Sequence, residues 1–91
     1  MRRFSRWIAA VCLIGVLQLG VWAGEAIPLS ELPKPVVQAI QERFPQGEML
    51  SAERETDDGQ LKFEVKVRSD GKVFEVDVTP DGQILSVDEE D

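Results

Sequence analysis

The sequence predicts an α+β fold in which one N-terminal helix packs on a four-stranded antiparallel meander sheet. Apolar residues recur every four positions from Leu32 to Phe44, as they do on one side of an amphipathic helix. Asp-Gly then occurs three times, at residues 58–59, 70–71 and 81–82, between segments that alternate apolar and polar residues. The chain of 91 residues is long enough for one small domain.

The first 23 residues have the pattern of a secretory signal peptide. Three arginines in the first six residues precede an almost entirely apolar stretch at residues 7–23. Val21 and Ala23 suit the −3 and −1 positions of a cleavage site, which predicts cleavage between Ala23 and Gly24. We therefore expect an exported protein, periplasmic or extracellular after cleavage. The alternative is an uncleaved membrane anchor, since this stretch lies at the lower limit for crossing a bilayer.

The predicted helix follows a short lead-in at residues 24–31. Its apolar stripe consists of Leu32, Val36, Ile40 and Phe44. Prolines at positions 33 and 35 fit a first helical turn, where backbone N–H groups have no partner within the helix. The Pro-Gln-Gly segment at 45–47 ends the helix.

The three Asp-Gly pairs predict two-residue hairpin turns, because both central residues of such turns take positive φ. These turns imply the following mostly apolar cross-strand pairs: Leu50–Val67, Ala52–Val65, Thr56–Leu61, Phe63–Val78, Val65–Val76, Val67–Phe74, Val76–Val87 and Val78–Leu85. A slip of one residue at the central turn would turn Glu75 and Asp77 toward the core, so the register is well specified.

The two faces of the predicted sheet differ in polarity. The face expected under the helix carries Leu50, Leu61, Phe63, Val65, Val67, Phe74, Val76, Val78, Leu85 and Val87. The opposite, solvated face carries Ser51, Glu53, Glu55, Lys62, Glu64, Lys66, Glu75, Asp77 and Ser86. Arg54 is the one misfit on the apolar face, where its guanidinium is expected to extend outward.

Charge and composition exclude several classes of function. The chain has a net charge of −7, and the segment from Gly24 holds all 17 acidic residues but only seven of the ten basic ones. This balance argues against nucleic-acid binding. There is no histidine, and the only cysteine is Cys12 in the predicted signal peptide. We therefore expect no catalytic residues, no cofactor, no disulfide and no enzymatic activity.

The pattern of residues 28–90 resembles a PepSY domain. The resemblance rests on the proline-led helix that ends at Pro45, on the strand segments Lys62–Val67 and Phe74–Val78, and on the turns at 70–71 and 81–82. PepSY-like domains occur in propeptides of secreted metallopeptidases and in bacterial envelope proteins. The resemblance implies a non-catalytic module that inhibits or regulates a peptidase, and small related domains resemble β-lactamase inhibitors. It supplies no catalytic residues.

An acidic row is the only metal candidate in the sequence. The predicted pairing sets Glu53, Glu64 and Asp77 side by side across three strands, an arrangement of like charges that destabilises a sheet. A plain solvated face is the favoured interpretation. The alternatives are a site for a divalent cation, which for calcium needs six to eight oxygens, or a site for a basic side chain of a partner.

The first predicted strand, about Met49 to Thr56, is expected to be an open sheet edge. Such edges accept an extended segment of a partner by strand addition. The candidate partner-binding residues are Met49, Leu50, Ser51, Ala52, Glu53 and Arg54.

The sequence thus predicts a small exported, non-catalytic binding module with another envelope or secreted protein as its partner. The alternatives are a cation-binding or sensing module and a structural envelope component. No nucleic acid is expected, and the membrane is contacted only through an uncleaved signal sequence. The last residues, from about 88, are expected to form an acidic tail.

Overall fold

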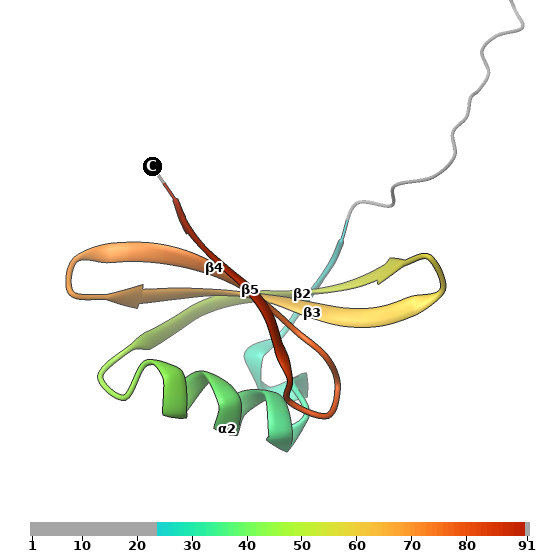
Figure 1. Ribbon diagram of the computed structural model, residues 1–91, viewed down its shortest axis with the longest axis horizontal. Coiled ribbons are helices and arrows are strands. Elements are labelled where there is room, and N and C mark those ends of the chain that lie inside the picture. The colour runs from blue at the N-terminus through green and yellow to red at the C-terminus, as the bar shows by residue number, and fades with distance from the viewer. Residues whose placement is uncertain (1–23, 91) are drawn as a thin grey trace, which may run out of the picture.

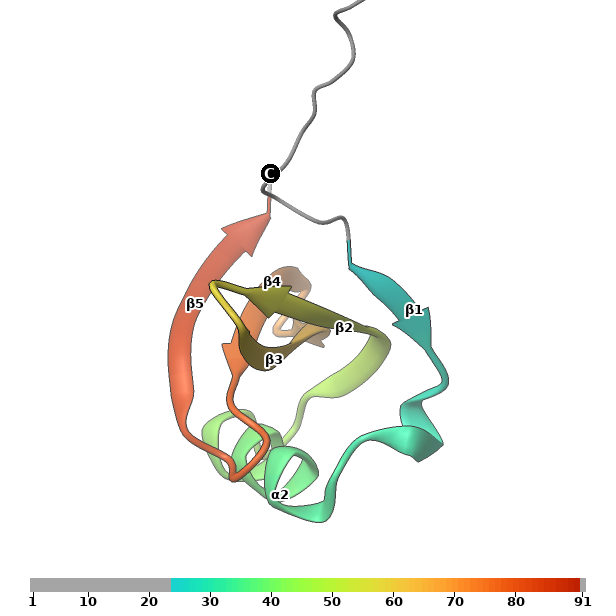
Figure 2. The same cartoon turned by 90° about the vertical axis from the view of Figure 1, so that its right-hand side faces the viewer.

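The computed structural model describes residues 24–90, which form a five-stranded sheet with one helix on one of its faces (Figures 1 and 2). The expected signal peptide lies outside the described residues. The elements, in chain order, are β1 (Glu25–Ile27), the 3₁₀ turn η3 (Leu29–Glu31), α2 (Lys34–Arg43), β2 (Glu48–Asp57), β3 (Gln60–Ser69), β4 (Lys72–Val78) and β5 (Ile84–Glu90). The strands lie in the sheet in sequence order, each antiparallel to its neighbours. The α+β class is as expected, but the prediction of four strands is wrong.

The fifth strand is β1, which lies in the segment that was expected to be only a lead-in. It pairs Glu25 with Arg54 and Ile27 with Ala52 along the edge of β2. Three residues are too few to produce a recognisable alternating pattern, and Pro28 follows at once. The strand lies at the right-hand edge of the sheet in Figure 2, and η3 follows it and leads the chain to α2.

Helix α2 is shorter than its apolar stripe. Leu32 and Pro33 are extended, with ψ of 136° and 147°. The proline that follows Leu32 disfavours a helical conformation at Leu32. The helix ends at Arg43, and the N–H of Phe44 donates to the carbonyl of Ile40 at 2.8 Å. All four stripe residues are nonetheless buried.

The two hairpins β2–β3 and β3–β4 have the predicted tight turns. Asp58 and Asp70 both have φ of 54°, and the following glycines both have φ of 76°. The central hairpin pairs Phe63 with Val78, Val65 with Val76 and Val67 with Phe74, so its predicted register is confirmed. Ala52–Val65, Thr56–Leu61 and Val76–Val87 are confirmed as well.

Two irregularities move the outer pairings away from the prediction. A shift between Met49 and Ser51 pairs Met49, not Leu50, with Val67. A second shift between Asp77 and Val78 pairs Val78 with Ile84, not Leu85. The third turn is wider than two residues: the N–H of Thr79 donates to the carbonyl of Gln83 at 2.9 Å, and the N–H of Gln83 donates back to the Thr79 hydroxyl at 2.9 Å.

The core lies between α2 and the sheet. Its buried residues are Leu32, Val36, Ile40, Phe44, Ala52, Phe63, Val65, Val67, Val76 and Val78. Met49 and Ile84 pack against this core, whereas Leu61 and Leu85 are 40% and 52% exposed. The prediction that Leu61 and Leu85 are core residues is therefore wrong; Leu85 turns outward because the β4–β5 shift brings Ile84 inward. Strand β5 continues to Glu90, so residues 88–90 are not a tail.

Candidate functional site

The open face of the sheet is the candidate site. We define the open face as the face opposite α2, which no described element covers (Figure 2). Strand alternation places on it nine acids, Glu48, Glu53, Glu55, Asp57, Glu64, Glu75, Asp77, Asp88 and Glu90, and three basic residues, Lys62, Lys66 and Arg68. The excess of carboxylates makes this face a strongly negative surface.

The predicted rows across the open face are present in the register. Glu53 lies opposite Glu64, which lies opposite Asp77 on its other side. The neighbouring row sets Ser51 opposite Lys66 and Glu75 opposite Asp88. The acidic row therefore exists as adjacent like charges on β2, β3 and β4.

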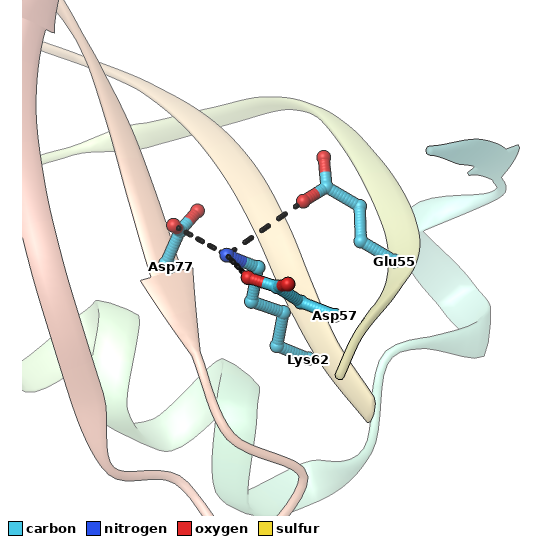
Figure 3. A network of polar contacts seen from close by, with 4 residues as sticks. All are labelled: Glu55, Asp57, Lys62 and Asp77. Atoms are coloured by element: carbon cyan, nitrogen blue, oxygen red, sulfur yellow. Dashed lines mark hydrogen bonds and ion pairs between the residues drawn. The ribbon is translucent and has the colours of Figure 1, made fainter. Parts of the chain in front are cut away.

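Lys62 offsets part of this negative charge at one end of the face. Its Nζ lies 3.2 Å from an oxygen of Asp77, 3.9 Å from one of Glu55 and 4.0 Å from one of Asp57 (Figure 3). The hydrogen bond to Asp77 raises the pKa of Lys62 above its ordinary value. Lys62 thus forms ion pairs with three carboxylates, and its side chain is only 21% exposed.

Lys66 neutralises the opposite end. Its Nζ lies 3.0 Å from Glu90 of β5, reaching diagonally past Glu75. The hydrogen bond to Glu90 raises the pKa of Lys66. The pKa of Glu90 is lowered, first by hydrogen bonding with Glu75 and then by Lys66. This pair ties the C-terminal end of β5 to the middle of the sheet.

Between the two lysines, Glu64 has the most perturbed environment. Carboxylate oxygens of Glu53, Glu55 and Glu64 all lie within 4.8 Å of one another. Hydrogen bonding to Glu55, desolvation and hydrogen bonding to Glu75 raise the pKa of Glu64 to about 8. At neutral pH the Glu64 carboxyl is therefore largely protonated and donates to a neighbouring carboxylate. The centre of the face holds a proton where a cation would otherwise balance the charge.

A small hollow lies over this centre, with a volume of about 120 Å³. It is lined by Ser51, Glu53, Glu64, Lys66 and Glu75. The hollow is large enough for a few waters or the head group of a basic side chain. Among the described residues, the three glutamates at 53, 55 and 64 form the one group close enough to share a metal ion. Three carboxylates supply only part of the oxygen set that calcium prefers.

The sheet edge expected to bind a partner is partly occupied by β1. Ala52, Glu53 and Arg54 already pair with β1, so β2 is not the open outer strand that was predicted. Arg54 Nη2 donates to Glu25 Oε1 at 2.7 Å, which raises the pKa of Arg54 and explains where this misfit side chain goes. Met49, Leu50 and Ser51 lie beyond the end of β1.

A second pocket, of about 390 Å³, was not foreseen from the sequence. It is lined by Arg43, Phe44, Pro45, Gln46, Ser69, Asp70, Lys72 and Phe74. The Phe44 and Phe74 rings are 5.3 Å apart, and the Arg43 guanidinium lies 4.7 Å from the Phe44 ring. No local motif marks this pocket, because it forms only where the end of α2 meets the β3–β4 turn.

None of residues 24–90 is histidine or cysteine. Within residues 24–90, no helix combines the length and the apolar character required to cross a membrane.

Comparison of the chain with protein-family models, with curated proteins and with solved structures finds no match.

Proposed function

We propose that this protein is a small exported, non-catalytic binding module that takes a basic segment of another envelope or secreted protein on the open face. The observation that carries this proposal is the charge of that face, where nine acids outnumber three basic residues on a surface that no described element covers. Both lysines are already engaged in ion pairs. A basic partner segment would find the carboxylates of Glu75 and Asp88, which make no ion pair within residues 24–90, and electrostatic attraction would speed its association.

The PepSY-like pattern of residues 28–90 supports a more specific form of this proposal. In that form the partner is a secreted or envelope peptidase, and the module inhibits or regulates it. The segment from Gly24 has no histidine or cysteine, which supports a role in binding rather than catalysis.

The test is capture of proteins from the exported fraction on the immobilised domain. Glu75→Gln combined with Asp88→Asn removes two open-face charges while keeping side-chain shape. The matched control combines Glu31→Gln with Glu42→Gln, which removes two exposed charges from η3 and α2 on the other side of the molecule. We expect the parent and the control to capture the same protein, about 0.3 M salt to release it, and the open-face variant to lose at least about tenfold in affinity. Equal capture by both variants would contradict the proposal.

A second candidate function is binding of a divalent cation, which the close approach of Glu53, Glu55 and Glu64 favours. Millimolar calcium would then raise the melting temperature of the parent, and Glu64→Gln would lose most of that rise. An unchanged melting temperature of the parent would remove this candidate.

A further inference from the structure

The backbone of Gly24 lies directly against two acidic side chains of the open face. The β1 register sets Ala26 opposite Glu53, and its continuation sets Gly24 opposite Glu55. A Cβ atom at Gly24 would overlap Glu53 Oε1 and would lie 2.9 Å from Glu55 Cγ. A side chain at position 24 would require the Glu53 and Glu55 side chains to move.

This contact brings the Gly24 nitrogen close to both side chains. The nitrogen lies two bonds from the hypothetical Cβ, a separation of about 2.5 Å, so it is within about 5 Å of Glu53 Oε1 and within about 5.5 Å of Glu55 Cγ. In the uncleaved chain this nitrogen is a neutral amide. Cleavage between Ala23 and Gly24, which the sequence predicts, converts it to an α-ammonium at the same position.

The carboxylates around Gly24 are short of positive charge. Glu53 and Glu64 make no ion pair within residues 24–90, and Glu55 has only Lys62, at 3.9 Å. Lys62 is itself shared with Asp57 and Asp77. An added ammonium would therefore meet the carboxylates of Glu53 and Glu55, which lie beside the protonated Glu64.

Strand β1 also has little else to hold it. It consists of three residues, two of them exposed, and its contact with the core is made by the partly buried Ile27. Its one ion pair joins Glu25 to Arg54, whose side chains are 68% and 43% exposed. Exposed pairs of this kind contribute little stability.

We propose that signal-peptide removal creates a new ion-pair site, in which the α-ammonium of Gly24 binds Glu53 and Glu55 and fastens β1 to the sheet. The inference rests on cleavage after Ala23 and does not depend on the proposed function of the open face. Processing and completion of the fold are then coupled, because only the cleaved chain carries the cation.

The site has a defined pH dependence. The groups that face the ammonium are Glu53 and Glu55 on β2 and, next to them, Glu64 and Lys62 on β3; Glu25 and Arg54 lie on the other side of β1. The carboxylates raise the pKa of the amine above its ordinary value of about 7.7–8.0. The stabilisation is therefore complete below that ordinary value and is lost as the pH rises through the raised pKa.

The test uses the chain from Gly24 to Asp91, which contains every described element and the whole core. Chemical synthesis supplies it with either a free or an acetylated amine at Gly24. At pH 6.5 and low salt we expect the free-amine form to melt about 2–6 °C higher than the acetylated form. NMR titration should place the pKa of the free amine at least about half a unit above its ordinary value. The difference in melting temperature should vanish above about pH 10.

A pair of double variants assigns the effect to the proposed partners. Glu53→Gln with Glu55→Gln should abolish both the melting difference and the amine shift. Glu42→Gln with Glu89→Gln, which removes two exposed charges that make no ion pair among the described residues, should preserve both.

Three results would overturn the inference. One is equal melting of the free and acetylated forms with an amine that titrates at its ordinary pKa. Another is an equal loss of the effect in both double variants. The third is an intact mass showing that the exported protein begins at a residue other than Gly24. If the Glu53/Glu55 variant fails to fold, the pKa of the Gly24 amine in the parent still decides whether the ion-pair site forms. Partner capture by the Glu75/Asp88 variant tests the proposed function separately.

Discussion

Glu64 shows how much a single position depends on its neighbours across the strands. The alternating segment that contains Glu64 predicts only that the Glu64 side chain points away from the core. The register adds Glu53 on one side and Asp77 on the other, and hydrogen bonding to Glu55 then raises its pKa to about 8. The native state accordingly binds a proton that the unfolded chain releases above its ordinary pKa near 4.5.

The stability of the acetylated Gly24–Asp91 chain should therefore fall as the pH rises from about 4.5 to about 8. In that window the folded state holds more protons than the unfolded state. Acetylation keeps the Gly24 amine from titrating. Glu64→Gln should flatten this dependence and raise the free energy of unfolding at pH 8 by about 1–2 kcal/mol, a figure that allows for solvent screening of a partly exposed group. Urea unfolding at several pH values measures it, and Glu89→Gln should retain the parent's slope.

At the scale of elements, turn chemistry and strand alternation agree for the central hairpin. Asp70 and Gly71 take the positive φ values that a tight turn needs, and the turn then sets Val65 opposite Val76. The third Asp-Gly pair behaves differently, because only Gly82 has positive φ there. A Cβ on Gly82 would lie 2.7 Å from the carbonyl oxygen of Pro35, so this turn is shaped by its contact with the start of α2.

Strand β4 permits a matched test of the register. Val76 is fully buried against the core, whereas Val73 lies on the open face and is half-buried. Val76→Ala should lower the free energy of unfolding by about 1–3 kcal/mol through lost burial and a cavity. Val73→Ala should cost less than about 1 kcal/mol. Equal midpoints of denaturant unfolding for the two variants would mean that the faces of β4 are assigned wrongly.

At the scale of the whole molecule, the sheet separates apolar residues from charged ones. The ten buried apolar residues lie between α2 and one face of the sheet, and the opposite face carries nine acids. Of the described ion pairs, five join open-face acids to Lys62, Lys66 or Arg68. The fold thus concentrates like charges on one surface.

Salt should consequently stabilise the domain. Raising sodium chloride from about 10 mM to about 0.2 M shortens the screening length. Repulsion among many acids should weaken more than the few ion pairs do, so we expect the melting temperature of Gly24–Asp91 to rise by about 2–5 °C. The Glu75→Gln/Asp88→Asn variant should respond less than the parent. A melting temperature that falls with salt would show that the ion pairs dominate.

The central sheet and the composition of the open face were predictable because they follow from local rules. Alternation with a period of two and Asp-Gly turns set the pairs from Phe63–Val78 to Val67–Phe74, and this register brings Glu53, Glu64 and Asp77 into one row. The buried stripe of α2 follows from its period of four. Each of these features depends on residues close together in the chain.

Long-range packing decided the rest. Strand β1 is too short to carry a pattern and exists only because β2 offers it an edge. The shift at Met49/Ser51 pairs Met49 with Val67, and the shift at Asp77/Val78 pairs Ile84 with Val78. Met49 and Ile84 thereby pack against the core in place of Leu50 and Leu85. The contact of Gly24 with Glu53 and Glu55 joins residues about 30 positions apart. Local propensity carries no information about such contacts, because they depend on how the folded elements meet.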